Sequence, residues 1–388
     1  MKTKILITLL IAFETATAQW APVNNGLSNL YVNTLFSNGA NIFVGTQGGG
    51  AYLTGNNGNN WNAINSGLTS TCNVNTFAIN GSTIFAGTDA LGAFRSTDNG
   101  TSWTAINNGL TYLDVSSFAI NSNSLFAGVY SAGVYVSTNN GSTWTVVNNV
   151  LPVVSMAINN QTLYVGTGNN GVFVSNNNGG NWAAAGTLTL VTVVESLAVS
   201  GSSIFAGTIN AGVFLSTNNG NSWTQVNSGL TSNDIRALLI VGTNIFAGTT
   251  AGLFFSNNNG ISWSAVNTGL TNLNLRTIAI NGSNIYIGTF GGGVFTQPLS
   301  QIVSINEISK NDFRIKVYPN PVNEKLGIEF EKNTIEKISI SNCLGEIIFI
   351  LNNPTSKQEI DLSSFSSGIY FLKAESKEGQ RVFKILKE

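Results

Sequence analysis

Residues 74–107 read VNTFAINGSTIFAGTDALGAFRSTDNGTSWTAIN, and this stretch decides the fold. It contains four short runs, NTFAIN, TIFAGT, GAFRST and SWTAIN, in which apolar residues alternate with small or polar ones, and Gly or Asn stands between the runs. Alternation with a period of two predicts strands, and Gly and Asn are the residues that tight turns require. The stretch therefore predicts a unit of four antiparallel strands.

The unit repeats along the chain at a period near 40 residues. Its second strand recurs seven times as an apolar-aromatic-x-Gly segment, at 42–46, 84–88, 125–129, 163–167, 204–208, 245–249 and 285–289. All seven tryptophans follow the same period, with spacings of 41, 42, 41, 38, 41 and 40 residues: Trp20, Trp61, Trp103, Trp144, Trp182, Trp223 and Trp263. Four strands per repeat are typical of a propeller blade, because a lone sheet cannot bury both of its faces. We expect an all-β fold with a seven-bladed β-propeller over residues 19–300.

The two ends of the repeat region complement each other. The last unit ends after GGGVFT at 291–296 without a tryptophan strand, whereas residues 19–23, QWAPV, form a tryptophan strand without a unit. We expect this N-terminal strand to complete the seventh blade and to close the ring by backbone hydrogen bonds. A linear solenoid is the alternative, and it gives no reason for the complementarity.

A turn motif, [S/T]-x-[D/N]-x-G-x-x-W, lies between the third and fourth strands at 54–61, 96–103, 137–144, 175–182, 216–223 and 256–263. It resembles the Asp-box, or BNR repeat, of sialidase-like and sortilin-like propellers. We expect structural roles: the Asn or Asp accepts hydrogen bonds from its own turn, Gly supplies a positive φ, and Trp packs between blades. Only Asp98 provides a carboxylate at the third position, which argues against calcium binding in these turns.

The charged residues divide the chain in two. Residues 20–300 contain three Arg, five acidic residues and no Lys, whereas residues 301–388 hold 12 of the 17 basic and 12 of the 18 acidic residues. A region with so few cations has no basic stripe, so we expect no nucleic-acid binding. The change marks a linker at 301–313 and a second domain at 314–388, whose alternating runs predict a small Ig-like β-sandwich.

This tail resembles the C-terminal type IX secretion sorting domain of Bacteroidota, the Por secretion tail. The matching residues are Tyr318-Pro319-Asn320-Pro321, Leu344-Gly345, Ser367-Gly368-Ile369-Tyr370 and the terminal segment from Lys384 to Lys387. The resemblance implies that residues 314–388 bind the type IX secretion machinery, and that the protein is secreted or reaches the outer cell surface through the periplasm. An ordinary accessory Ig-like module is the alternative.

Residues 1–18 have the features of a secretory signal peptide. Lys2 and Lys4 precede an apolar run from Ile5 to Phe13, and residues 16–18, ATA, form an A-x-A cleavage site. This run is too short to span a bilayer, and no other segment is long and apolar enough, so we expect no membrane insertion. A buried N-terminal strand is the alternative.

The chain lacks the residue types that several catalytic mechanisms need. It contains no His, which excludes Ser-His-Asp and Cys-His catalysis, and Cys72 and Cys343 fall in different domains. We therefore expect no disulfide, no metal site and no cofactor. The resemblance to sialidases implies an arginine triad, a Tyr-Glu pair and an Asp acid/base, but the three arginines of the repeats have no recognisable triad context.

Several of the few charged residues of the repeats occupy equivalent positions in successive repeats. Thirteen residues after each tryptophan stand Asn33, Val74, Ser116, Ala157, Glu195, Arg236 and Arg276, and Val154 is the expected equivalent in the shortened unit. This position begins the innermost strand, beside the expected central channel. We predict a polar ligand-binding patch of Glu195, Asp234, Arg236 and Arg276. The alternative is an internal ion-pair network that only satisfies itself.

The sequence favours a non-catalytic binding protein for an extracellular glycan, peptide or protein ligand, and it predicts no catalytic residue. The alternative is a carbohydrate-active hydrolase of the sialidase-like propeller type, which would need two carboxylates facing one cleft. A cell-surface scaffold is the third possibility.

Overall fold

The computed structural model describes residues 19–388 except 122–123, 150–151, 189–192, 304–314, 331–334, 343–345 and 377–378. The predicted signal peptide therefore lies outside the described residues, as do Cys343, Leu344 and Gly345. The chain divides after Ile302 into two compact units. The described residues form an all-β fold with one short 3-10 helix, η1 (Leu299–Gln301), and within them no helix could cross a membrane.

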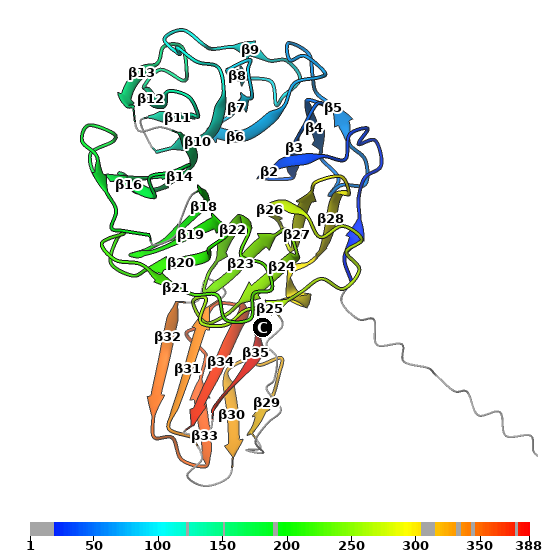
Figure 1. The fold of residues 1–388 in the computed structure, drawn as a ribbon. Helices are drawn as coiled ribbons and strands as arrows, with labels where there is room; N and C mark the ends of the chain where they lie inside the picture. Colours follow the sequence, from blue (N-terminus) through cyan, green and yellow to red (C-terminus); the bar gives the residue numbers. More distant parts are fainter. Residues whose placement is uncertain are drawn as a thin grey trace, which may run out of the picture. The chain divides into compact units, whose positions relative to one another are not determined.

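The first unit consists of four-stranded antiparallel sheets that follow the sequence repeat, and Figure 1 shows these sheets arranged around a common centre. Six of them run in chain order from the innermost to the outermost strand. Their strands are β2 (Val32–Asn38), β3 (Asn41–Thr46), β4 (Ala51–Thr54) and β5 (Asn62–Ala63); β6 (Val74–Asn80), β7 (Thr83–Thr88), β8 (Ala93–Ser96) and β9 (Thr104–Ala105); β10 (Val115–Ile120), β11 (Leu125–Val129), β12 (Gly133–Ser137) and β13 (Thr145–Asn148); β14 (Val153–Asn159), β15 (Thr162–Thr167), β16 (Val172–Ser175) and β17 (Ala183–Ala184); β18 (Val193–Ser200), β19 (Ser203–Ile209), β20 (Gly212–Ser216) and β21 (Thr224–Gln225); β22 (Ile235–Val241), β23 (Asn244–Thr249), β24 (Gly252–Ser256) and β25 (Ser264–Ala265).

A further sheet joins the two ends of this unit. It contains β26 (Leu275–Asn281), β27 (Asn284–Thr289) and β28 (Gly293–Pro298), and its outermost strand is β1 (Ala21–Pro22). Ala21 lies opposite Thr296 and Pro22 opposite Phe295. The inner strands contact one another in sequence order from β2 to β26, and β26 in turn contacts β2.

The second strand of each sheet explains the recurring apolar-aromatic-x-Gly segment. In β7, the residues from Ile84 to Thr88 are all buried, because both faces of the sheet are covered by neighbouring sheets. A Cβ atom at Gly87 would lie 2.6 Å from Cγ1 of Val115 in the next sheet. Glycine is therefore required here by close packing between sheets rather than by a turn.

The tryptophans connect neighbouring sheets. Six indole N–H groups donate to a backbone carbonyl oxygen of the preceding sheet, at 2.6 to 2.8 Å. In each case the acceptor is the third residue after the tryptophan of that sheet; for example, Trp103 donates to Ile64 and Trp20 to Val266. Each of these rings thus fills space between two sheets while its one polar atom is satisfied.

Trp182 differs from the other six tryptophans. Its indole N–H donates to Gly179 of its own turn, at 2.9 Å. Like Trp223, it is only partly buried. The acceptor position in the preceding sheet is Val147, which is the extra residue of a bulge in β13 between the pairs Val134–Asn148 and Tyr135–Val146. A bulge residue leaves the ladder and turns its carbonyl group, so the cross-sheet bond is not made.

The six turns between third and fourth strands have the hydrogen bonds that their motif predicts. In the second sheet, Asp98 accepts from the Ser96 hydroxyl at 2.7 Å and from the Ser102 backbone N–H at 2.9 Å, and Ser96 accepts from the Gly100 N–H at 2.8 Å. Hydrogen bonds from the Ser102 side chain and backbone lower the pKa of Asp98 to about 2. The residue before the glycine is always Asn with a positive φ, such as Asn99 at 60°, so two consecutive residues share the left-handed conformation rather than glycine alone.

The second unit contains two sheets that share one core. The first sheet has β29 (Ile315–Tyr318), β30 (Lys325–Phe330) and β33 (Lys357–Asp361). The second has β32 (Ile347–Asn352), β31 (Lys337–Asn342), β34 (Gly368–Ser376) and β35 (Gly379–Lys387). Inward residues of both sheets, such as Ile328, Ile340 and Leu372, form a single buried cluster.

We predict that Trp20→Ala lowers the free energy of unfolding of the first unit by about 3–5 kcal/mol, because a fully packed ring and its hydrogen bond to Val266 are lost. Trp182→Ala is the matched control and should cost at least about 1 kcal/mol less, since Trp182 makes no bond to the preceding sheet. Urea unfolding followed by tryptophan fluorescence measures both, because all seven tryptophans lie in this unit. Equal losses would contradict the cross-sheet role of the indole N–H.

Candidate functional site

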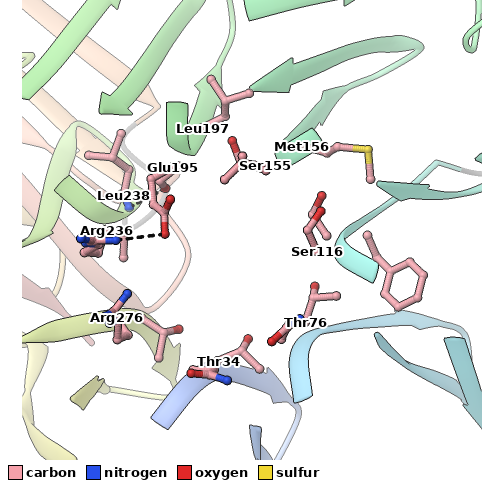
Figure 2. Close-up of a pocket in the computed structure, with 18 of the residues that line it drawn as sticks. Thr34, Thr76, Ser116, Ser155, Met156, Glu195, Leu197, Arg236, Leu238 and Arg276 are labelled. Carbon is pink, nitrogen blue, oxygen red and sulfur yellow. Dashed lines mark hydrogen bonds and ion pairs between the residues drawn. The ribbon is translucent and has the colours of Figure 1, made fainter. Parts of the chain in front are cut away.

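A cavity of about 560 Å³ lies where the inner strands of the first unit converge. Figure 2 shows side chains from the inner strands, including Thr34, Thr76, Ser116, Glu195 and Arg276, directed toward its centre. The volume is within the range of ordinary small-molecule sites. Half of the 22 lining residues carry an amide or a hydroxyl group, so the cavity offers many neutral hydrogen-bonding partners.

Every inner strand bulges at the same place, and the bulge residue faces the cavity. In each sheet the pairing of the first and second strands skips one residue, as between Val74 and Thr76. The skipped residues are Asn33, Asn75, Ser116, Val154, Glu195, Arg236 and Arg276. All seven line the cavity. A bulge redirects a side chain out of the pleat, so these positions are released from packing between sheets.

In the second sheet the bulge lies one residue after the position that the 13-residue spacing from tryptophan predicts. The predicted position there was Val74, but Val74 is fully buried and the bulge residue is Asn75. In the shortened unit the bulge residue is Val154, the expected equivalent, and not Ala157. A sequence signal does mark the position: each bulge residue follows a fully buried Val, Ile or Leu and precedes Thr, Ser or Ala.

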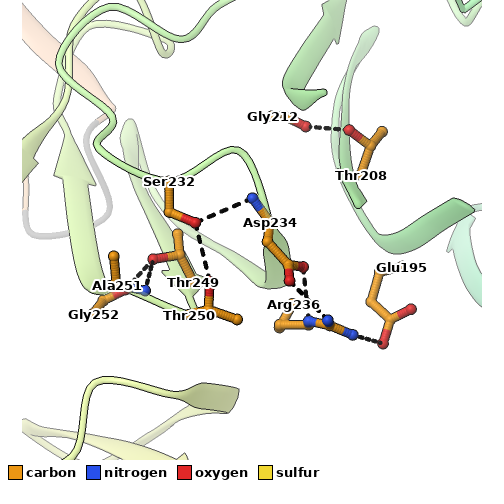
Figure 3. A network of polar contacts seen from close by, with 10 residues as sticks. All are labelled: Glu195, Thr208, Gly212, Ser232, Asp234, Arg236, Thr249, Thr250, Ala251 and Gly252. Atoms are coloured by element: carbon orange, nitrogen blue, oxygen red, sulfur yellow. Dashed lines mark hydrogen bonds and ion pairs between the residues drawn. The ribbon is translucent and has the colours of Figure 1, made fainter. Parts of the chain in front are cut away.

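Three of the four predicted site residues form one ion-pair network, which Figure 3 shows. Arg236 binds Asp234 through two contacts, Nε to Oδ1 and Nη2 to Oδ2, both at 2.8 Å. Its Nη1 lies 3.5 Å from Oε1 of Glu195. Glu195 and Arg236 line the cavity, whereas Asp234 is not among the lining residues. Arg236 is therefore held by protein carboxylates on two sides.

Glu195 is a partly buried acid. Burial raises its pKa above the ordinary value of 4.5, and the nearby charges of Arg236 and Arg276 oppose that rise. The carboxylate thus depends on the arginines to remain ionised inside the cavity wall.

Arg276 lies outside this network. Its guanidinium carbon is 4.7 Å from the centre of the Phe290 ring, and Tyr31 meets Phe290 edge-on with the ring centres 4.9 Å apart. Within the described residues Arg276 has no ion pair, and its buried Nε has no hydrogen-bond partner. Burial, and then the charge of Arg236, lower its pKa, but a guanidinium remains protonated at neutral pH. The cavity therefore contains a fixed cation that makes no direct ion pair with a described carboxylate, while Glu195 and Asp234 act on it from a greater distance.

One other carboxylate reaches the cavity. Asp89, from the segment that joins β7 to β8, lines it and accepts a hydrogen bond from Nδ2 of Asn73 at 3.2 Å. Asp89 and Asp114 face each other in an isolated β-bridge. Over the described part of the chain, no three His, Cys, Asp or Glu side chains cluster in a way that could hold a metal ion. The arrangement is suited to binding a ligand with an anionic group and several hydroxyl or amide groups.

Sequence reasoning missed the neutral wall of this site. Asn33, Asn75, Thr34 and Thr76 line the cavity, but they are the same residue types that turns and strand ends use throughout the repeats. Asn33 stands at the position counted from the tryptophans, whereas the place of the other three beside the cavity could have been recognised only from the bulge pattern.

The comparisons with known proteins concern the two units differently. Residues 316–388 match the family described as the secretion system C-terminal sorting domain. This confirms the type IX sorting domain that the motifs of the tail predict, so the protein is exported to the cell surface or secreted. No curated protein matches the chain.

Solved structures resemble the chain in fold. PorZ, an essential surface component of the type IX secretion system of Porphyromonas gingivalis, is 14% identical with a TM-score of 0.55, and the match covers 94% of this chain and 60% of PorZ. YCF48 bound to D1 peptide is 12% identical with a TM-score of 0.61, covering 74% of this chain and 98% of YCF48. A GH74 xyloglucanase from Xanthomonas campestris is 14% identical with a TM-score of 0.58, covering 82% and 60%. All three are β-propellers, and at these identities the likeness shows a propeller fold alone.

We predict that Arg236→Ala lowers the free energy of unfolding by about 2 kcal/mol at pH 7, because it leaves Glu195 and Asp234 partly buried without their cation. Arg276→Ala should cost about 1 kcal/mol or less, since it removes only the contact with Phe290. The part due to Glu195 should shrink as the pH falls through its raised pKa, because protonation removes the uncompensated charge.

Urea unfolding of both variants at pH 7 and pH 4 tests this division. A larger loss for Arg276→Ala than for Arg236→Ala would show that Arg276 is the structural member of the pair.

Proposed function

We propose that this protein is a non-catalytic binding protein of the cell surface or the extracellular medium, and that its ligand enters the cavity of the first unit with an anionic group bound by Arg276. The observation that carries the proposal is a guanidinium that lies over Phe290 in a 560 Å³ polar cavity and has no ion pair within the described residues. A partly buried cation without a direct ion pair costs free energy, and a ligand carboxylate in contact with it would relieve that cost. Type IX export is consistent with a ligand outside the cell.

We also propose the number of blades, the type of repeat and the way in which the ring is closed. We take residues 19–300 as a seven-bladed propeller of Asp-box repeats, closed by the N-terminal strand β1, and the tail as an Ig-like sandwich. Support comes from the pairing of β1 with β28, the contact of β26 with β2 and the six turns with the expected hydrogen bonds. A closed ring fixes all seven bulge residues around one cavity.

A carboxylate is the group that best fits the site. Guanidinium groups bind carboxylates through charge-assisted hydrogen bonds, and Arg236 already binds Asp234 beside the cavity through one hydrogen bond from Nη2 to Oδ2 and an ion-pair contact between Nε and Oδ1. Arg276 has the same donors without a described acceptor on Nε. The amides and hydroxyls of Asn33, Asn75 and Ser116 would bind the neutral parts of the ligand.

A hydrolase is the second candidate, because two carboxylates, Glu195 and Asp89, line the same cavity. The xyloglucanase among the similar structures is a hydrolase. Glu195 is engaged by Arg236, which disfavours it as a general acid. Turnover of reporter glycosides that Asp89→Asn abolishes would favour the hydrolase.

The experiment compares arginine variants of the full chain in calorimetric binding to three carboxylates: galacturonate, N-acetylneuraminate and a glutamate-terminated peptide. Arg276→Gln should weaken binding about 10- to 100-fold through the loss of charge-assisted hydrogen bonds. Arg95→Gln is the matched control, because Arg95 lies on β8, does not line the cavity and directs its side-chain hydrogen bonds to Asn140 and Ser142 of the neighbouring turn. Affinity that is unchanged in Arg276→Gln, or equally reduced in Arg95→Gln, would overturn the assignment of the site.

A further inference from the structure

Most of the exposed large apolar side chains described in the first unit lie on one rim. Of eight such side chains among its described residues, six lie in two kinds of segment, those that lead into an inner strand and those that join a second strand to a third: Leu30, Tyr31, Tyr112, Leu113, Tyr130 and Leu273. The other two are Val146, on β13, and Ile261, in a turn between third and fourth strands. Gln47, Asn73 and Asp89 belong to the same two kinds of segment and line the cavity, so this rim is where the cavity opens.

Three tyrosines dominate this rim. Tyr31, Tyr112 and Tyr130 are 49%, 55% and 50% exposed, and they are the exposed tyrosines among the described residues of the first unit. A half-exposed tyrosine presents a ring face that can stack on a ligand and a hydroxyl that can form a hydrogen bond.

Tyr31 connects the rim to the cation of the site. It pairs with Phe290 through an isolated β-bridge and packs edge-on against the Phe290 ring, and Arg276 lies over that same ring. A ligand that reaches Arg276 from the rim therefore passes the Tyr31 ring.

Tyr112 and Tyr130 flank the sheet of β10 to β13. The backbone N–H of Tyr130 donates to the Asp114 carbonyl at 3.0 Å, and the Leu113 carbonyl accepts from Ala90 and Gly92 of the preceding sheet. Asp114 in turn bridges to Asp89, which lines the cavity. The backbone around Tyr112 and Tyr130 is thus connected to Asp89, which lines the cavity, although neither tyrosine is itself a lining residue.

The chemistry of this surface favours sugar rings over protein side chains. A pyranose ring has an apolar C–H face that stacks on an aromatic ring and a periphery of hydroxyls that bind amides and hydroxyls. Protein-binding surfaces are enriched in Tyr as well, but together with Arg, Met and Trp, whereas residues 20–300 contain three Arg, and their tryptophans are buried or partly buried between sheets.

We infer that the ligand is an acidic oligosaccharide, in which one carboxylate-bearing ring enters the cavity to meet Arg276 while flanking rings stack on Tyr31, Tyr112 and Tyr130. This inference rests on the proposed function and names its ligand class. Binding energy then comes from two sources, the carboxylate in the cavity and the chain of rings along the rim.

The test uses hexamers of galacturonate, hyaluronan and alginate, each compared with its acidic monosaccharide, together with neutral galactose hexamer and hexaglutamate. At least one acidic hexamer should bind the full chain about tenfold or more tightly than its monosaccharide. Tyr112→Ala and Tyr130→Ala should each remove about tenfold of hexamer affinity and leave monosaccharide affinity unchanged, because only the longer ligand reaches them. Tyr112→Phe and Tyr130→Phe should retain hexamer binding, since the ring is kept.

Val146→Ala and Ile261→Ala are the controls, because they remove exposed apolar side chains away from the rim and should change no affinity. Thermal unfolding of each variant confirms that the fold is intact. Loss of monosaccharide and hexamer binding in Arg276→Gln supports the proposed function independently of the tyrosines.

The two ideas fail in different ways. Acid binding that depends on Arg276 but not on chain length or the tyrosines would overturn the oligosaccharide inference and leave the anion site. Binding of hexaglutamate that the tyrosine variants weaken, or no binding of any acidic hexamer, would also overturn it. Hexamer binding that is indifferent to Arg276 would overturn the proposed function itself.

Discussion

The hydrogen bond from an indole N–H to a carbonyl of the preceding sheet is the interaction on which the first unit depends. A four-stranded sheet with two apolar faces cannot stand alone, so each sheet must be covered on both sides. Six tryptophans make this bond, and Trp20 makes it from the N-terminal segment to Val266, which joins the beginning of the chain to its penultimate repeat. Glycines such as Gly87 allow the same sheets to approach closely. Packing between sheets therefore determines most residues of the repeat.

Each inner strand has one position, its β-bulge, at which the side chain is not constrained by packing between sheets. Where the ladder bulges, the extra residue faces the cavity and no longer packs between sheets. Four of these positions hold Asn, Ser or Val, and three consecutive sheets hold Glu195, Arg236 and Arg276. Since Arg236 is paired with two carboxylates, Arg276 is the lining cation without a direct ion pair, and we propose that it is the one that binds a ligand. In this proposal the fold supplies the positions and a few charged residues determine the ligand.

Much of this could be predicted from the sequence, because repetition makes a weak local signal strong. The strand pattern, the turn motif and the gathering of charges at one phase are visible in the residues themselves. The remainder depended on tertiary contacts. The bulge in β13 changes the role of Trp182, the bulge in β6 selects Asn75 instead of Val74, and the stacking of Arg276 on Phe290 joins segments that share no local pattern. The sequence left open whether the charged patch is a network or a site; the structure divides it, with Arg236 in the network and Arg276 outside it.

A crystal structure of the full chain with a bound acidic hexasaccharide tests the central claim most directly. The account predicts one sugar carboxylate within hydrogen-bonding distance of the Arg276 guanidinium, with Phe290 behind it and the neighbouring rings on the tyrosine rim. A ligand seated on the opposite face of the unit, or in the cavity with its carboxylates turned away from Arg276, would contradict the account.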